Sequence, residues 1–97
     1  MSESISWSDW LDYNAETISK APINSGVFMM HAAMKILFIQ GTKNIRKDLE
    51  STLSNACISQ ATRFRYTVSE QYQKIHDELI SDYKNRHEGN MPKCMQE

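Results

Sequence analysis

Residues 26–49 constrain the fold of this chain more than any other stretch. Two segments, about residues 26–31 and 35–40, contain β-branched and aromatic residues that favour strands. The second segment is apolar on both faces, which is typical of a strand covered on two sides. Gly41 ends it, and Thr42 or Asn44 can cap the helix expected over about residues 44–54. The apolar residues of that helix recur on one face: Ile45, Leu49 and Leu53.

The remaining elements are predicted from the same kinds of pattern. Helical spacing of apolar residues predicts an amphipathic helix over about residues 5–20. Alternation over residues 61–66 predicts a third strand. A capping box at Thr67–Glu70 predicts the start of a last helix, which should end before Gly89. The predicted fold is α+β, with a small three-stranded, mainly antiparallel sheet flanked by helices and an extra N-terminal helix.

Length and composition favour one globular domain. The chain has 97 residues, of which 40% are hydrophobic and 24% charged, so we expect a single domain over residues 1–97 with its core at about 24–95. No apolar run is long enough to span a membrane, and the first residues lack the pattern of a signal peptide. These features predict a soluble cytoplasmic protein.

Basic residues concentrate in the middle of the chain. The net charge is −1, but residues 35–65 carry six bases and two acids. This segment could form a cationic patch that binds DNA or RNA. It is equally consistent with an ordinary solvated helix face. The alternating strand supports both interpretations too, because interleaved arginines and aromatics can bind single strands and can also reflect simple in/out patterning. The candidate nucleic-acid-binding residues are Lys43, Arg46, Lys47, Arg63 and Arg65.

The cysteines, histidines and tryptophans have no clear catalytic spacing. Cys57 and Cys94 lack zinc spacing and are expected to be reduced, although a bridge between them stays open. His31 has no neighbouring ligands in sequence, so a structural or exposed histidine is expected. Trp7 and Trp10 fall on the apolar face of the expected first helix. They could anchor that helix in the core or form a surface that binds a partner.

Several short motifs resemble those of the GIY-YIG nuclease domain. The family reads Gly-Ile-Tyr, a hairpin, Tyr-Ile-Gly, and a helix that opens with Asn-Leu-Arg. The matching residues here are Gly26-Val27-Phe28, Phe38-Ile39-Gln40 and Asn44-Ile45-Arg46. Small stand-alone members of the family add further motifs in the same order. Their counterparts are Trp10, Ala21-Pro22, residues 61–66, residues 76–80 and residues 92–95.

The resemblance implies a one-metal nuclease site, whose residues are replaced in this chain. The two tyrosines of the family correspond to Phe28 and Phe38, and its phosphate-binding arginine corresponds to Asp48. Its metal-binding glutamate corresponds to His76, and its supporting asparagine to Met95. We therefore expect no catalytic residues, no metal ion and no cofactor.

Three functions are compatible with these residues. The first is a catalytically inactive GIY-YIG-like binding module with weak affinity for DNA or RNA through the basic region 43–65. The second is a protein-binding or self-associating module that uses an apolar groove formed by Phe28, Phe38 and Met95. The third is a divalent-metal-dependent endonuclease with a rearranged site that includes His76 or Glu78.

Overall fold

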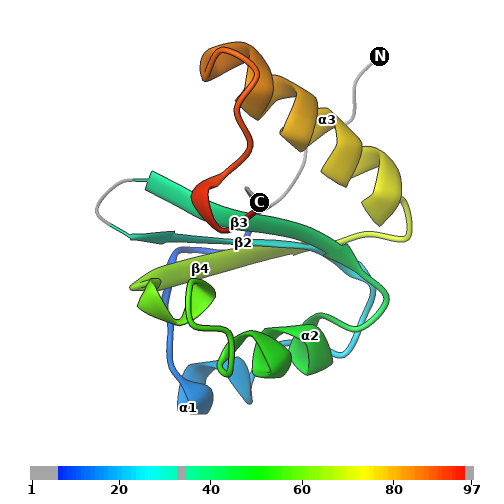
Figure 1. Ribbon diagram of the computed structural model, residues 1–97. Helices are drawn as coiled ribbons and strands as arrows, with labels where there is room; N and C mark the ends of the chain where they lie inside the picture. Colours follow the sequence, from blue (N-terminus) through cyan, green and yellow to red (C-terminus); the bar gives the residue numbers. More distant parts are fainter. Residues whose placement is uncertain (1–6, 33–34, 96–97) are drawn as a thin grey trace.

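The protein is built around a four-stranded antiparallel sheet. The computed structural model describes residues 7–32 and 35–95. The strands are β1 (Leu11–Asp12), β2 (Gly26–Ala32), β3 (Lys35–Thr42) and β4 (Arg63–Val68), and their order in the sheet is β1-β4-β2-β3 (Figure 1). The α+β class is as predicted. The prediction of three strands is wrong, because residues 11–12 add a short fourth strand at the β4 edge.

The two predicted strands of the 26–49 stretch form the β2–β3 hairpin. Its register places Phe28 opposite Gln40 and Met30 opposite Phe38, with a bulge after Met30. β2 also pairs with β4, and this pairing explains Gly26. A Cβ atom at residue 26 would lie 2.0 Å from the Thr67 carbonyl oxygen, so only glycine allows the two strands to approach this closely.

The predicted N-terminal helix over residues 5–20 is wrong. Residues 5 and 6 lie outside the described residues, and residues 7–10 are not helical. This segment instead pairs with β4, because the Ser8 amide donates to the Tyr66 carbonyl at 2.9 Å and Leu11 lies opposite Phe64. Only α1 (Ala15–Ile18) is helical, and it begins where the Asn14 side chain accepts a hydrogen bond from the Thr17 amide.

Helices cover both faces of the sheet (Figure 1). On one face lie α1, α2 (Ile45–Thr52) and the short 3₁₀ helix η1 (Ile58–Gln60). On the other face lie α3 (Tyr72–Arg86) and the 3₁₀ helix η2 (Lys93–Met95). Each face has its own core, one around Phe28, Ile45 and Phe64 and one around Val27, Met29 and Ile39. None of the helices in the described parts of the chain is long and apolar enough to cross a membrane.

The last helix begins later than predicted and ends as predicted. Thr67 and Val68, expected in a capping box, belong to β4, and α3 begins at Tyr72 without a side-chain cap. The Ser69 hydroxyl accepts a hydrogen bond from the Gln71 amide just before the helix. At the other end Gly89 has a φ of 87° and donates its amide to the Lys84 carbonyl at 2.7 Å, a glycine stop signal.

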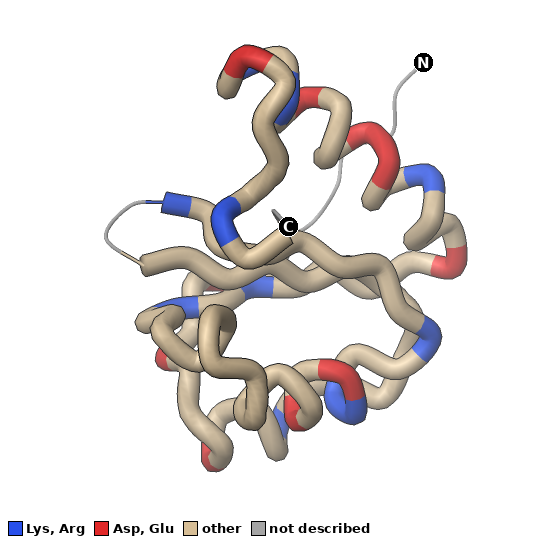
Figure 2. Tube along the Cα trace, viewed as in Figure 1, with Lys and Arg blue, Asp and Glu red and all other residues tan. Residues whose placement is uncertain are grey.

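Basic residues are spread over the molecule and do not gather on one face (Figure 2). The basic residues of segment 35–65 therefore do not form a single surface. Acidic positions recur along α3, and α2 carries both signs of charge (Figure 2).

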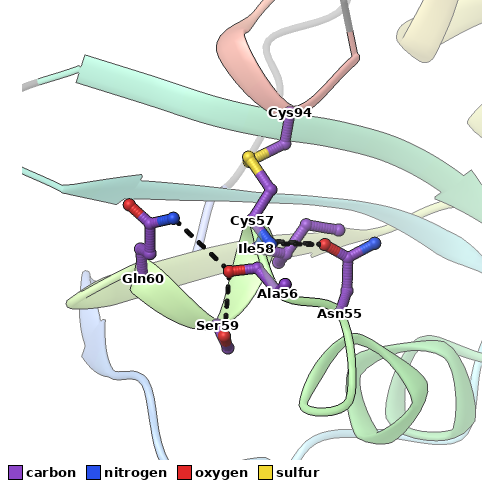
Figure 3. Close-up of a disulfide and its surroundings, with 7 residues drawn as sticks. All are labelled: Asn55, Ala56, Cys57, Ile58, Ser59, Gln60 and Cys94. Carbon is purple, nitrogen blue, oxygen red and sulfur yellow. Dashed lines mark hydrogen bonds between the residues drawn. A yellow bond between two sulfur atoms is a disulfide. The ribbon is translucent and has the colours of Figure 1, made fainter. Parts of the chain in front are cut away.

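Cys57 and Cys94 form a disulfide bond, which corrects the expectation that both are reduced (Figure 3). Their Cα atoms are 5.6 Å apart, although 37 residues separate them in sequence. The Asn55 side chain accepts hydrogen bonds from the Cys57 and Ile58 amides and shapes the turn into η1. The bond ties η1 to η2. The spacing of the two cysteines does not predict this bond, because η1 and η2 come together only in the folded chain.

Candidate functional site

A shallow groove runs along the free edge of β3, between α2 and α3. It consists of three adjoining hollows of about 220, 370 and 340 Å³. Asp48 lines the first two hollows, Gly41 and Tyr72 line the second and third, and Gln40 lines the first and third. We call this surface the β3 groove. It brings Phe38, Asp48 and His76 to one continuous surface, although the three residues come from different elements.

Asp48 is held by two neutral side chains. Its Oδ2 accepts a hydrogen bond from Gln40 Nε2 at 3.1 Å and a second, short one from the Thr42 hydroxyl. Thr42 is buried at the end of β3, and Asp48 lies in the first turn of α2. The carboxylate therefore connects the helix to the strand. The sequence indicated Thr42 only as a candidate helix cap. The structure gives that role to Asn44, whose side chain accepts a hydrogen bond from the Lys47 amide, and Thr42 instead binds Asp48.

His76 attaches α3 to the edge of β3. Its Nε2 lies 3.2 Å from the Ile39 carbonyl oxygen. A carbonyl only accepts hydrogen bonds, so Nε2 carries the proton in this arrangement. Its Nδ1 lies 3.6 Å from the carboxylate of Asp77, whose side chain is 85% exposed. The imidazole thus satisfies a backbone group that an edge strand leaves unpaired.

The three apolar positions do not form one groove. Phe28 is completely buried in the α2-side core, with its ring centroid 6.3 Å from that of Phe38. Met95 packs against the core on the opposite face of the sheet. Only Phe38 lines the β3 groove. The expected apolar groove of Phe28, Phe38 and Met95 is therefore not formed.

The residues at the implied metal site do not fit a magnesium ion. Mg²⁺ requires near-octahedral oxygen ligands. His76 offers nitrogen atoms, and the one that faces the sheet donates to Ile39. Within residues 7–32 and 35–95, no group of three or more histidine, cysteine, aspartate or glutamate side chains is placed to hold a metal ion.

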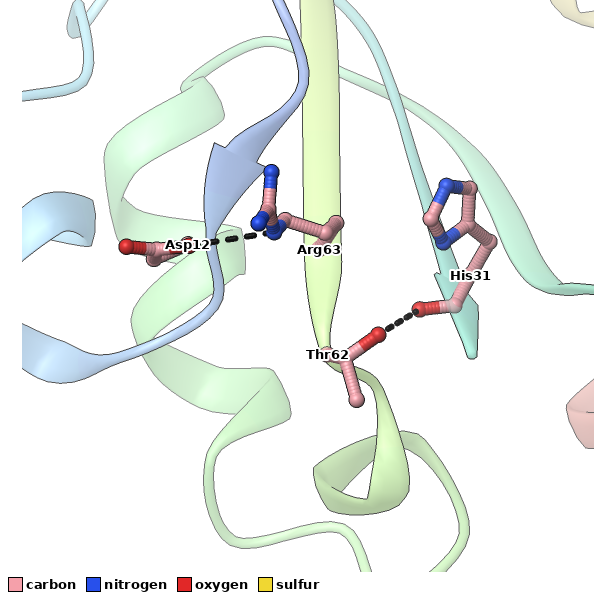
Figure 4. Close-up of polar contacts among 4 residues, drawn as sticks. All are labelled: Asp12, His31, Thr62 and Arg63. Atoms are coloured by element: carbon pink, nitrogen blue, oxygen red, sulfur yellow. Dashed lines mark hydrogen bonds and ion pairs between the residues drawn. The ribbon is translucent and has the colours of Figure 1, made fainter. Parts of the chain in front are cut away.

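The five predicted basic residues fall into four separate places. Lys43 and Lys47 line the middle hollow of the β3 groove, beside Asp48. Arg46 turns away to the loop before β2, where its Nε donates to the Ala21 carbonyl at 2.7 Å. Arg63 lies on β4 beside the opposite edge strand β1, 3.0 Å from the carboxylate of Asp12 (Figure 4). The groove therefore contains two of the five predicted cations.

Arg65 lies in an aromatic cluster. Its guanidinium carbon is 4.6 Å from the ring centroids of both Trp7 and Trp10, which is cation–π distance. Burial lowers the pKa of Arg65 from its usual value. His31 packs against Trp10 at a centroid distance of 4.0 Å, and its backbone carbonyl accepts a hydrogen bond from the Thr62 hydroxyl (Figure 4). Both tryptophans are partly buried and pack against the core of Val27, Met29 and Ile39, although they do not lie on the helix that was expected to carry them.

Together these features define a small α+β domain whose antiparallel sheet lies between helices and whose groove follows one sheet edge. The sequence matches no model of a protein family and no curated protein sequence. Solved structures do match it. The GIY-YIG N-terminal endonuclease domain of UvrC from Thermotoga maritima, bound to its catalytic magnesium ion, has a TM-score of 0.67 and 19% identity, and the match covers 84% of this chain and 93% of that domain.

A point mutant of the same domain, also bound to its catalytic divalent cation, has a TM-score of 0.67 and 20% identity over the same coverage. The chain therefore has a GIY-YIG-like fold, as the motifs in its sequence predicted. At 19–20% identity this similarity establishes the fold of the chain but not its function.

Proposed function

We propose that this chain is a GIY-YIG-fold domain that binds nucleic acid without cleaving it. The environment of Asp48 supports the absence of cleavage, and Lys43 and Lys47 in the middle hollow support the nucleic-acid ligand. At the position that the resemblance assigns to a phosphate-binding arginine, the chain has a carboxylate whose hydrogen bonds are directed to Gln40 and Thr42.

The chemistry of cleavage argues against a catalytic groove. Cleavage of a phosphodiester needs positive charge near the developing negative charge of the transition state. Asp48 places a negative charge on this surface. The phenylalanines at positions 28 and 38 have no hydroxyl to position water, and His76 donates its Nε2 proton to a backbone carbonyl.

The two lysines support a nucleic-acid ligand. Lys43 and Lys47 lie at the start of α2 and line the middle hollow, where the helix dipole adds a partial positive charge. Neither has a carboxylate within ion-pair distance in the described parts of the chain. Two phosphate contacts give a modest, salt-dependent affinity. We expect raising the salt from about 50 to about 200 mM to weaken binding about tenfold, since the slope is roughly −0.9 per contact.

Fluorescence anisotropy with labelled single- and double-stranded DNA and RNA tests the proposal. The double variant Lys43→Gln, Lys47→Gln should lose most of the affinity of the unmodified chain. The matched control is Lys20→Gln, an exposed lysine that does not line the groove, and it should bind normally. Absence of binding at low salt would refute the proposal, as would equal binding by the control and the double variant.

A second candidate is self-association through the edge of β3. This strand has eight residues and lies at the end of the sheet, where His76 already binds the Ile39 carbonyl, and edge strands can pair with strands of other chains. Sedimentation velocity over a range of concentrations tests it. A dimer would favour this candidate, and a monomer at all concentrations would remove it.

A further inference from the structure

A larger basic concavity lies at the opposite end of β3 from the β3 groove. It has a volume of about 520 Å³ and is formed where the C-terminal end of α3 and η2 meet the start of β3. We call it the α3–η2 pocket. Three cations line it, Lys35 from β3, Arg86 from α3 and Lys93 from η2, against the single acid Glu88.

The three cations are nearly free of carboxylate partners. Among the residues that the structure describes, neither Lys35 nor Lys93 has an acid within ion-pair distance. Arg86 lies 3.4 Å from Asp82, and both side chains are mostly exposed, so this pair is weak. The pocket is therefore net positive in a chain whose overall charge is −1. Figure 2 shows the basic positions at the start of β3 and at η2, two elements that contact each other.

The helix dipole explains only part of this arrangement. Basic residues are common in the last turn of a helix because they stabilise its negative end, and Arg86 fits that role. Lys35 and Lys93 come from a strand and a 3₁₀ helix, so the α3 dipole does not account for them. Three like charges that converge on one hollow repel each other until an anion binds between them.

The walls of the pocket also provide a flat aromatic surface. The rings of Tyr83 and His87 are stacked, with centroids 3.9 Å apart and an interplanar angle of 22°. Ile36 adds an apolar side chain, and Asn90 adds an amide that both donates and accepts hydrogen bonds. Aromatic and apolar walls with a few polar groups are typical of sites for small planar ligands.

We propose that the α3–η2 pocket binds a phosphorylated nucleoside. Its phosphate contacts Lys35, Arg86 and Lys93, and its base packs on the Tyr83–His87 pair. This chemistry is shared by a free nucleotide and by the phosphorylated end of a nucleic-acid strand. The site is separate from the β3 groove, and the inference does not depend on the function proposed for that groove.

The disulfide bond contributes to the geometry of this pocket. Lys93 directly precedes Cys94, whose bond to Cys57 holds η2 against the rest of the domain (Figure 3). Reduction releases this constraint on Lys93, so we expect the reduced protein to bind the ligand several-fold more weakly than the oxidised protein.

Titration followed by two-dimensional NMR at low salt tests the proposal with defined probes: AMP, adenosine, inorganic phosphate, and a short oligonucleotide with and without a 5′-phosphate. We expect saturable shifts for AMP at residues of the pocket, with a dissociation constant below about 1 mM, and much weaker effects for adenosine. The double variant Lys35→Gln, Lys93→Gln should bind AMP at least tenfold more weakly. The control Lys74→Gln, an exposed lysine near the start of α3, should bind as the unmodified chain does.

The outcomes separate the two ligand sources and the two sites. Tighter binding of AMP than of the phosphorylated oligonucleotide identifies a free nucleotide, and the reverse identifies a strand end. Retention of AMP binding by the Lys43→Gln, Lys47→Gln variant shows that the pocket is independent of the β3 groove. Absence of saturable AMP binding, equal binding of AMP and inorganic phosphate, or normal binding by the Lys35→Gln, Lys93→Gln variant would overturn the proposal.

Discussion

Asp48 on α2 accepts a short hydrogen bond from the hydroxyl of Thr42 at the end of β3. This contact joins the first helix after the hairpin to the edge strand and places a negative charge beside the two lysines of the groove. The same carboxylate thus stabilises the fold locally and opposes phosphate binding. Its two effects are separable, because asparagine retains an oxygen that accepts hydrogen bonds and loses the charge.

Replacement of Asp48 by asparagine should therefore raise the affinity for nucleic acid about threefold. The gain corresponds to removal of a repulsion of roughly 0.6 kcal/mol for a unit charge at about 7 Å in a high dielectric. Anisotropy titration measures it, with Glu16→Gln as the control, because Glu16 is exposed on α1 and does not line the groove. Equal gains in both variants would indicate a general charge effect, and an unchanged affinity for Asp48→Asn would place the ligand elsewhere.

The Cys57–Cys94 bond should contribute substantially to stability. Closing a loop of 37 residues lowers the entropy of the unfolded chain enough to stabilise the fold by about 4 kcal/mol. Urea unfolding of the oxidised chain, the reduced chain and Cys94→Ser measures this difference. We expect the last two to share one lower midpoint, and reductant to leave Cys94→Ser unchanged. A midpoint that is the same with and without reductant in the unmodified chain would show that the bond does not form.

The contacts of Arg65 with the two indole rings should be visible by fluorescence. Trp7 and Trp10 are the only tryptophans in the sequence, so indole emission reports on this cluster. Arg65→Gln removes two cation–π contacts and should lower the free energy of unfolding by about 1–2 kcal/mol and shift the emission. The control is Arg63→Gln on the same strand, whose exposed pair with Asp12 should contribute less than about 1 kcal/mol. Similar emission from both variants would contradict this account.

Tyr13 should make stability depend on pH in the alkaline range. Its hydroxyl lies 2.7 Å from Thr52 Oγ1, which itself donates to the Leu49 carbonyl at 2.6 Å, so Tyr13 is the donor to Thr52. Burial raises the pKa of Tyr13. Below about pH 10 the phenol is neutral in both folded and unfolded chains. Above that value the unfolded chain loses its proton first, so the free energy of unfolding falls as the pH rises.

Thermal unfolding from pH 8 to 11 checks this expectation against Tyr13→Phe. At pH 8 the variant should be less stable by about 1 kcal/mol, because it lacks the hydrogen bond. Above pH 10 the difference between the two proteins should shrink. A constant difference over the whole range would show that Tyr13 does not titrate with folding.

Local patterns predicted the hairpin, α2 and the end of α3, because neighbouring residues determine them, but they placed the start of α3 too early. The strand preference of residues 26–40 and the stop signal at Gly89 are properties of short segments, and both were confirmed. The N-terminal segment was misread because Trp7, Trp10 and Leu11 happen to recur at helical spacing. Its actual conformation depends on pairing with Phe64, more than 50 residues later, which no local pattern reveals.

Motif order selected residues that the fold brings together, but it gave no side-chain orientation. Phe38, Asp48 and His76 all line the β3 groove. Side-chain direction was not predictable. Arg46 turns to the Ala21 carbonyl and Arg65 contacts two indole rings, and both depend on residues that are distant in sequence. The α3–η2 pocket was missed because its cations come from three separate segments.

The most direct test of the central claim follows binding and cleavage in the same reaction. Labelled DNA and RNA, single- and double-stranded, are incubated with the protein and with Mg²⁺ or Mn²⁺, and anisotropy is recorded before the strands are resolved by denaturing electrophoresis. We expect an anisotropy increase that rising salt removes, with every strand intact. Cleavage that requires the metal ion and disappears in His76→Ala or Glu78→Ala would contradict it.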